Sequence, residues 1–233
     1  MFKWRVSSLL VAIPLTAAAV IGLGELTAAR DRQDVAGLDR FVAQYQQQAQ
    51  KNPESADAQY ALALANSYAA EVTMELRDKK KSAVYAEAGI QPAQKAVAED
   101  GGNAEYHRLL GELCGQVIPA NPLFGALKYG QCAHDEINKA LQLNNKLAVA
   151  YVSRGVGNYY LPEAMGGGLD QALKDFDQAI SLDPKLSEAY LWKGIALRKA
   201  GRNAPARESL QQAAQLNPAR LWIRQELEKT PAQ

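Results

Sequence analysis

The C-terminal third of the chain repeats a pattern of small, apolar and proline residues at an interval of 34 positions. The first copy is Ala172, Phe176, Ala179 and Pro184, and the second copy is Ala206, Leu210, Ala213 and Pro218. Self-similarity at this interval is typical of stacked helix–turn–helix units. Such units build a curved binding surface and only rarely carry a reaction of their own. The repeat therefore predicts an all-α protein and favours binding over catalysis.

The stretch Ser187–Pro218 contains the second copy, and its small and apolar residues have packing roles. Gly194 is small where the two helices of the unit cross, and Tyr190 and Leu210 fill the space around the crossing. Pro218 cannot continue a helix and sets the turn into the next element. This stretch resembles a nearly complete tetratricopeptide repeat (TPR). The residues that carry the resemblance are Ser187, Glu188, Ala189, Tyr190, Gly194, Leu197, Gly201, Ala206, Leu210, Ala213 and Pro218.

The TPR resemblance implies a right-handed α-solenoid of helix–turn–helix repeats with inserts and a C-terminal capping helix at Leu221–Lys229. Lys193 departs from the family pattern, which usually has Leu there, and Arg154 repeats the departure one unit upstream. We expect a single domain over residues 30–233. Its clearest repeats are 148–184 and 187–218, its weaker repeats are 104–145 and 56–101, and a helix from about 35 to 51 precedes them.

Two of the intervals between glycines that are expected at helix crossings exceed the repeat length of 34 positions. Gly155 and Gly194 are 39 positions apart, and the surplus falls in the turn 161–168. Gly111 and Gly155 are 44 positions apart, and that surplus falls in a long insert, 115–131, between the two cysteines. In the earliest repeat, Pro92 predicts either a helix kink or a second short helix.

Composition and charge exclude several classes of protein. Hydrophobic residues make up 48% and charged residues 22% of the 233 positions, which argues against a disordered chain. Removing residues 1–29 takes two of the 26 basic residues and one of the 25 acidic residues, which leaves 24 of each. A neutral chain gives no electrostatic case for nucleic acid or an anionic membrane as the main partner. The run 79–81 of three lysines is interpreted as a solvated helix end.

The N-terminus has the pattern of an export signal. Lys3 and Arg5 precede an uncharged stretch, residues 6–24, and small residues follow at 27–29. This order is typical of a secretory signal peptide cleaved near Ala29. The stretch also reaches the lower length limit of a membrane span, so a retained tether in the inner membrane is the alternative. Both interpretations predict an exported, periplasmic or extracytoplasmic domain.

Export affects the interpretation of the two cysteines, Cys114 and Cys132. In an oxidising compartment an isolated pair is usually bridged, so we expect one disulfide that fastens the insert between two antiparallel helices. Buried thiols are the alternative, and a metal site with His107 and His134 is the weakest one, because the spacing matches no zinc pattern. We expect no metal and no cofactor.

Candidate catalytic groups are weak. The glycines 166–168 precede a helix but lack the lysine of a nucleotide-binding loop, and no serine has a histidine at a recognisable spacing. Acidic residues in the last repeats are expected on exposed helix faces, namely Asp175, Asp177, Glu208 and Glu226. We therefore expect no enzyme.

In a TPR stack the first helix of each pair lines the concave face. By resemblance, the candidate partner-binding residues are Tyr60, Leu64, Tyr68, Arg108, Glu112, Val152, Val156, Tyr159, Tyr160, Leu191, Ile195 and Arg198. The run 152–160 is apolar and aromatic, as binding surfaces often are. Packing against the inserts or a neighbouring helix would explain the same pattern, and both interpretations stay open here.

These observations favour a non-enzymatic scaffold of the cell envelope that holds another protein or a peptide on its concave face. The alternative is a small-ligand-binding component that serves a membrane transporter, by resemblance to exported TPR subunits of solute-uptake systems. The two hypotheses differ in surface shape. A scaffold needs an open groove, whereas a ligand binder needs a closed and largely apolar pocket of a few hundred cubic ångströms.

Overall fold

A computed structural model describes residues 22–232 of the chain, and within that range every regular element is helical. The α-helices are α1 (Leu23–Asp31), α2 (Val35–Lys51), α3 (Ala56–Glu75), α4 (Lys79–Glu99), α5 (Ala104–Val117), α6 (Pro122–Leu143), α7 (Ala148–Tyr160), α8 (Leu169–Leu182), α9 (Ser187–Lys199), α10 (Asn203–Leu216) and α11 (Leu221–Glu228). Two 3-10 helices, η2 (Ile118–Ala120) and η3 (Glu163–Met165), lie in the turns where the spacing of glycines predicts inserts. The all-α prediction is confirmed.

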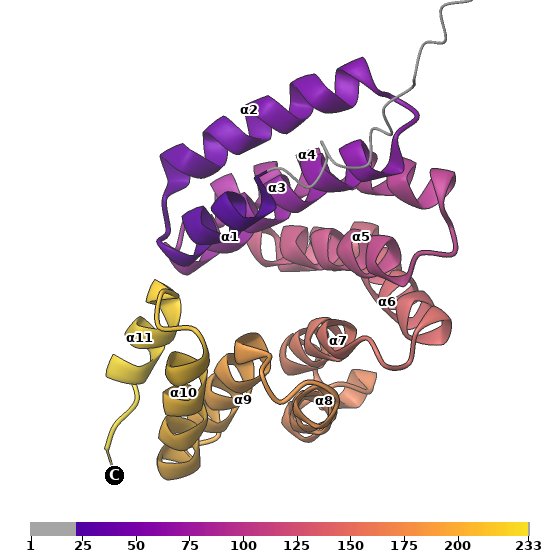
Figure 1. The fold of residues 1–233 in the computed structure, drawn as a ribbon. Coiled ribbons are helices and arrows are strands. Elements are labelled where there is room, and N and C mark those ends of the chain that lie inside the picture. Colours follow the sequence, from indigo (N-terminus) through magenta and orange to yellow (C-terminus); the bar gives the residue numbers. More distant parts are fainter. Residues whose placement is uncertain (1–21, 233) are drawn as a thin grey trace, which may run out of the picture.

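The helices pair as helix–turn–helix units and stack into a solenoid. The pairs are α3 with α4, α5 with α6, α7 with α8, and α9 with α10. The first helix of each pair contacts the first helix of the next pair, so α3, α5, α7 and α9 form the inner layer. The second helices, α4, α6, α8 and α10, form the outer layer. Figure 1 shows the stack curving so strongly that α11 lies near α1.

Helix starts follow from capping side chains. Asp34, Ser55 and Asp78 each accept a hydrogen bond from the backbone N–H three residues later, at distances of 2.8 to 3.2 Å. These bonds satisfy N–H groups that have no partner inside the helix. The predicted helix over 35–51 matches α2, and the predicted capping helix matches α11 to within one residue.

Close helix crossings explain the small residues of the repeat. A Cβ added to Gly194 would lie 2.6 Å from Leu210 Cγ, and one added to Gly155 would lie 2.5 Å from Phe176. Ala179 and Ala213 have no exposed surface. The two glycines therefore occupy positions where paired helices touch, and the two alanines are buried, as the repeat pattern predicts.

The predicted disulfide is present, but the insert that it fastens has a different form. Cys114 and Cys132 are bonded, with their Cα atoms 6.0 Å apart. The residues between them do not form a long loop, because α6 already begins at Pro122. Proline suits the first turn of a helix, where its missing N–H costs nothing. Most of the insert therefore extends α6 by about three turns, at 3.6 residues per turn.

Helix α4 passes through Pro92 without ending, so the alternative of a second short helix is wrong. Proline removes the hydrogen bond that its N–H would give to residue 88, yet the ring is buried between neighbouring helices. Tertiary packing outweighs the local cost at this position.

Helix α1 belongs to the folded domain. Leu26 has no exposed surface and Ala29 is 2% exposed, and both pack in the same core as Leu38 and Tyr45 of α2. The domain therefore includes residues 23–29, which the sequence assigns to the export signal. The basic head of that signal and most of its apolar stretch lie outside the described residues. Within residues 22–232, no helix combines the length and hydrophobicity that a membrane span requires.

Candidate functional site

The predicted concave face is largely filled by the protein itself. Five of the candidate residues are buried: Leu64, Arg108, Val152, Leu191 and Ile195. A further group is partly buried: Tyr60, Tyr68, Glu112, Val156, Tyr159 and Arg198. Tyr160 stands apart because 61% of its surface is exposed. The five buried residues are covered by other parts of the chain in the described structure, and their role as contact residues stays a prediction.

A buried ion-pair network links α3, α5 and α7. Arg108 is 4% exposed and donates to Glu105 at 2.6 and 2.7 Å and also to Glu112. Ser153 donates to the same Glu112 at 3.0 Å, and Tyr60 donates to Glu105 at 3.0 Å. Burial and the nearby Glu105 carboxylate raise the pKa of Tyr60, so its hydroxyl stays a donor. These groups are satisfied within the chain.

The two ends of the solenoid meet in a second network, around Arg220. This residue precedes α11, has no exposed surface, and donates to Glu71 at 2.8 Å and to Glu75. Arg30 of α1 pairs with Asp31 at 2.7 Å and with Glu188 of α9 at 3.0 Å. We call these six residues the end-closing cluster: Arg30, Asp31, Glu71, Glu75, Glu188 and Arg220. The cluster joins α1, α3 and α9 to the C-terminal segment.

Amide side chains strengthen the same junction. Asn217 donates to Asp31 at 3.0 Å, and Gln225 donates to Gln33 at 2.9 Å. Gln33 returns a bond to Gln225 at 3.2 Å and also donates to Glu75 at 2.7 Å. The C-terminal segment is thus fastened to Asp31 of α1, and to Gln33 just beyond α1, by side-chain bonds on both sides of Arg220.

The cluster holds more acid than base. Four carboxyl groups face two guanidinium groups, and Glu75 and Arg220 are almost fully enclosed, with side chains 1% and 0% exposed. Burial raises the pKa of Glu75 to about 7, Arg220 opposes that shift, and Glu71 adds to it. Burial likewise raises the pKa of Glu71. The enclosed negative charge is therefore only partly neutralised.

An aromatic surface occupies the C-terminal half of the inner layer. Tyr159 and Tyr160 of α7 lie edge to face with ring centroids 4.8 Å apart, and Tyr159 lies 6.1 Å from Trp192 of α9. Trp192 in turn lies 5.3 Å from Trp222 of α11. The Lys199 ammonium is 4.3 Å from the centre of the Tyr159 ring. Three helices thus contribute to one continuous row of rings, which we call the aromatic surface.

Two acidic residues expected on exposed faces are buried. Asp175 is 5% exposed and pairs with Arg154 at 2.5 Å. Glu226 is 5% exposed and pairs with Arg198 and with Lys229. The prediction for these two residues is wrong because an arginine on a neighbouring helix compensates each carboxylate. Asp177 and Glu208 are exposed, as expected.

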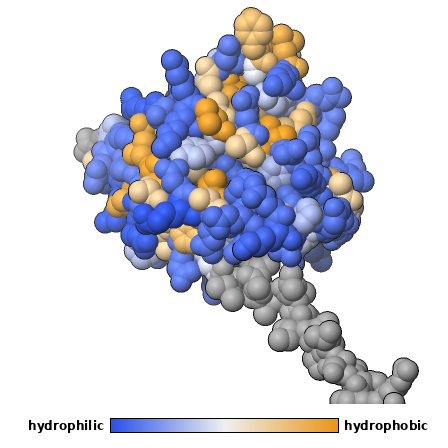
Figure 2. Space-filling view, turned by 90° about the horizontal axis from the view of Figure 1, so that it is seen from above, coloured by the Kyte–Doolittle hydropathy of each residue, from blue (hydrophilic) through white to orange (hydrophobic). Residues whose placement is uncertain are grey.

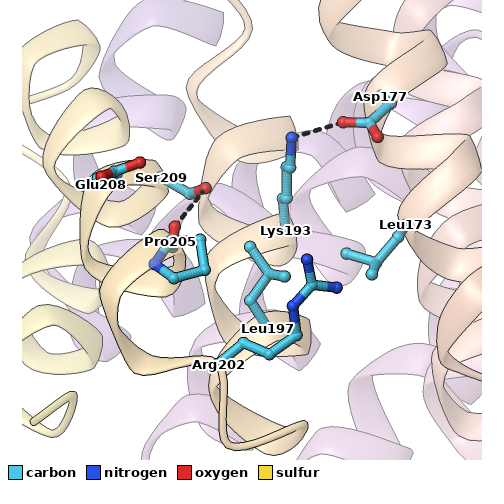
Figure 3. Close-up of a pocket in the computed structure, with 8 residues that line it drawn as sticks. All are labelled: Leu173, Asp177, Lys193, Leu197, Arg202, Pro205, Glu208 and Ser209. Carbon is cyan, nitrogen blue, oxygen red and sulfur yellow. Dashed lines mark hydrogen bonds and ion pairs between the residues drawn. The ribbon is translucent and has the colours of Figure 1, made fainter. Parts of the chain in front are cut away.

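A surface pocket lies between α8 and the α9–α10 pair (Figure 3). Its volume is about 260 Å³, and Asp177 and Lys193 form an ion pair of 2.6 Å at one side of it. A second pocket of about 120 Å³ lies between α2 and α4. Arg202, Glu208 and Ser209 also line the larger pocket, so its walls carry many polar groups.

The His107 ring is bonded to other groups of the chain through both of its nitrogens. His107 is bonded to the Glu136 carboxylate at 2.5 Å and to the Gly101 carbonyl at 3.1 Å. In the part of the chain that the structure describes, no three His, Cys, Asp or Glu side chains are grouped closely enough to hold a metal ion.

The sequence pattern does not indicate several residues of the aromatic surface and the end-closing cluster. Trp192 could have been found, because it lies one helix on from Tyr159 within a recognised repeat. Arg220, Glu71 and Glu75 carried no local signal, since Arg220 pairs with residues 145 and 149 positions earlier in the chain.

Figure 2 views the molecule from above and shows mainly hydrophilic side chains, with hydrophobic ones in separate small groups. At the start of α6, Leu123, Phe124 and Leu127 are 67 to 77% exposed.

Comparison with known proteins shows the family of this chain. Residues 187–220 match the tetratricopeptide repeat, and residues 26–164 match the family described as regulator of microtubule dynamics protein 1-3. Regulator of microtubule dynamics protein 3 of Bos taurus is 26% identical over 178 residues. That match covers 69% of this chain and 37% of the bovine protein, so the chain spans well under half of its relative.

The fold has a counterpart among solved structures. A TPR protein of Thermus thermophilus superposes with a TM-score of 0.63 at 18% identity, over 84% of this chain and 91% of the other. The likeness shows the TPR solenoid fold. Since the family match at residues 26–164 extends over more than half of the 233 residues, the chain belongs to the family of regulator of microtubule dynamics proteins 1–3.

Proposed function

We propose that this protein is a non-catalytic scaffold that binds a protein or peptide partner on its aromatic surface. The observation that supports this most directly is the row of rings from Tyr160 to Trp222, at whose open end Tyr160 is 61% exposed. Tyrosine and tryptophan provide large apolar area with a polar group at the edge, and they dominate interaction hot spots.

A charge beside the rings would orient such a partner. Lys199 is exposed above Tyr159, whereas Arg198 is already paired with the Glu226 carboxylate. A partner segment with apolar side chains and an acidic group would contact the rings and Lys199 together.

The small-ligand alternative has weaker support. It calls for a closed and largely apolar chamber, whereas the larger of the two described pockets is about 260 Å³ and carries Asp177, Lys193 and Arg202 on its walls. Protein binding is therefore the function we favour.

We place the scaffold in the cell envelope on the basis of the N-terminal pattern. Lys3, Arg5 and the uncharged stretch that follows support export, either with cleavage or as a membrane tether. Because Leu26 and Ala29 are buried in the domain core, we propose that any cleavage precedes α1 instead of following Ala29. N-terminal sequencing of protein recovered from the producing cell tests this, and a mature chain starting at Arg30 would contradict it.

The partner is sought by pull-down from an extract of the producing cell. Purified microtubules serve as a second probe, because the bovine relative is named for microtubule dynamics. Binding is then compared between the native chain and Tyr160→Ala and Trp222→Ala variants. We expect each variant to lose affinity by about thirtyfold, since truncating a central aromatic residue typically costs about 2 kcal/mol.

Two matched controls accompany the aromatic variants. Lys174→Ala and Glu208→Ala change exposed residues on the outer layer and should leave the affinity within about twofold. Helical content and melting temperature are recorded for all four variants. The proposal fails if a captured partner binds the Tyr160→Ala and Trp222→Ala chains as tightly as the native chain while both remain folded.

A further inference from the structure

The C-terminal segment 217–230 closes the solenoid on itself. Its Arg220 side chain has no exposed surface and lies among Glu71 and Glu75 of α3, Asp31 of α1 and Glu188 of α9. We call this enclosure the carboxylate pocket. The residue that fills it lies 145 positions beyond Glu75 in the chain, so the pocket exists only where the two ends meet.

Arg220 leaves the carboxylate pocket incompletely satisfied. Its Nε is buried and makes no hydrogen bond to a described residue, and the nearest carboxylate oxygens, of Glu188 and Asp31, are 3.5 and 3.7 Å away. Both oxygens of Glu188 also lack a hydrogen bond within the described chain, although one is 3.0 Å from Arg30. Four carboxyl groups face only two arginines at this site, and the excess negative charge is costly to bury.

The same segment also forms part of the aromatic surface. The Arg220 guanidinium lies 5.6 Å from the centre of the Trp222 ring, and Trp222 lies 5.3 Å from Trp192. Movement of Arg220 out of the carboxylate pocket would therefore move Trp222 as well. The pocket and the proposed partner surface are connected through two residues of one short segment.

Polar contacts join the segment to the N-terminal end. They include the Arg220 pairs, the bond from Asn217 to Asp31 and the reciprocal bonds between Gln33 and Gln225. The apolar side of α11 instead packs on α9 and α10, where Ile223 is fully buried. A buried polar junction depends on matched donors and acceptors, so an incoming group that offers the same donors as Arg220 can replace its bonds.

We propose that segment 217–230 is a displaceable latch, and that an arginine-bearing segment of the partner takes the place of Arg220 in the carboxylate pocket when the latch opens. The inference rests on the proposed function, because it assigns a second anchor point to the same inner surface. Arginine fits better than lysine, since its planar group can pair with two carboxylates at once while an ammonium acts as a single point charge.

Displacement is tested with a peptide of residues 216–231 as the probe. The labelled peptide is titrated with the full-length Arg220→Ala chain, and binding is followed by fluorescence anisotropy. We expect the native peptide to bind at least tenfold more tightly than the same peptide carrying Arg220→Ala, with an Arg220→Lys peptide in between. The native chain, whose pocket is occupied, should bind the native peptide at least tenfold more weakly than the variant chain.

Each outcome decides the matter. Equal binding of the native and Arg220→Ala peptides, or equal binding by native and variant chains, overturns the proposal. Binding should also weaken as salt increases, because an exposed peptide charge is attracted through screened electrostatics. An Arg202→Ala chain is the matched control, since it removes an exposed arginine elsewhere and should bind the peptide as the native chain does.

A second measurement covers the case in which Arg220→Ala disturbs folding. The Gln33→Cys and Gln225→Cys chain keeps Arg220, and a short bifunctional maleimide bridges the two new cysteines across the junction. The bridged chain should bind the peptide at least tenfold more weakly than the same chain with both cysteines singly blocked. Equal binding by the two preparations overturns the latch.

Neither measurement needs the natural partner, so the latch and the proposed function can fail separately. If peptide binding is independent of Arg220 while a captured partner still depends on Tyr160, the latch is wrong and the scaffold stands. If the peptide behaves as expected but partner binding does not depend on the aromatic surface, the proposed function is wrong. The carboxylate pocket is then still supported as an arginine-binding site.

Discussion

Small residues at helix crossings set how closely the paired helices approach. Ala179 and Ala213 have no exposed surface, and Gly194 contacts Leu210 so closely that a Cβ would lie 2.6 Å from its Cγ. A larger side chain at these places must push two helices apart, because protein interiors are packed as densely as crystals. Side-chain volume at single positions therefore controls the geometry of each unit.

Replacing Ala179 or Ala213 by leucine should lower the free energy of unfolding by roughly 1–3 kcal/mol through overpacking. Glu208→Leu changes an exposed residue of α10 and should stay within about 0.5 kcal/mol of the native value. Urea denaturation of the three variants measures the difference. Similar losses at all three positions would contradict the repeat register.

At the scale of elements, the pairing of α5 with α6 shows how an insert can be accommodated. Helix α6 begins ten residues before Cys132, and its first turns expose Leu123, Phe124 and Leu127. The disulfide fastens the helix to α5 at Cys114, which is 1% exposed. The extension therefore projects from a firmly anchored base.

Removing the disulfide should destabilise the domain and loosen this projection. The bond spans 18 positions, and closing a loop of that size is typically worth about 3 kcal/mol. We expect Cys114→Ala with Cys132→Ala to lower the free energy of unfolding by roughly 2–4 kcal/mol. Amide hydrogen exchange should accelerate in residues 118–131 more than in residues 133–143.

Thiol labelling of the native protein in denaturant provides the companion measurement. Recovered without reductant, the protein should show no reactive thiol. Two labelled cysteines per chain would mean that the bond is absent in the cell.

At the scale of the whole molecule, buried charges hold the first and last helices together. Arg220 joins α3 to the C-terminal segment, and Asn217 and Gln225 bond to the N-terminal end. These contacts join the two ends of the stack in the described structure. Stability and shape are thus linked through one cluster.

The free energy of unfolding should fall as pH rises from about 5 to 8. The pKa of Glu75 is raised from its usual value of 4.5 to about 7 in the folded chain, so folding takes up a proton in this interval. The stabilisation is complete below the unfolded pKa and is lost as pH rises through about 7. The pKa of Glu71 is shifted in the same direction. Between pH 5 and pH 8 we expect the free energy of unfolding of the native chain to fall by an amount on the order of 1–3 kcal/mol.

Glu75→Gln should remove most of this pH dependence, since a neutral amide keeps the shape without a titrating proton. Urea denaturation at pH 5, 6, 7 and 8 compares it with the native chain and with Glu228→Gln, which alters an exposed glutamate of α11. Parallel curves for Glu75→Gln and the native chain would show that Glu75 does not carry the effect.

Local features of the chain were predictable from sequence. The interval of 34 positions, the small residues at Gly155 and Gly194, the bounds of α2 and the pairing of Cys114 with Cys132 all follow from rules that act within one or two units. The helical form of the insert was not predictable from sequence, because proline at position 122 can begin a helix as well as end one. The burial of Asp175 and Glu226 was not predictable either, because their arginine partners lie on other helices.

The sequence by itself determined the repeat unit, since each unit is stabilised by contacts among neighbouring residues. Only the tertiary structure decided how the units close, because curvature accumulates from a small rotation at each unit and leaves no mark on any single one. Arg220 shows the reason most directly. Its sequence neighbourhood is that of an exposed turn, and only the curvature of the whole stack brings it to Glu71 and Glu75 and fills the surface that the repeat pattern alone would leave open.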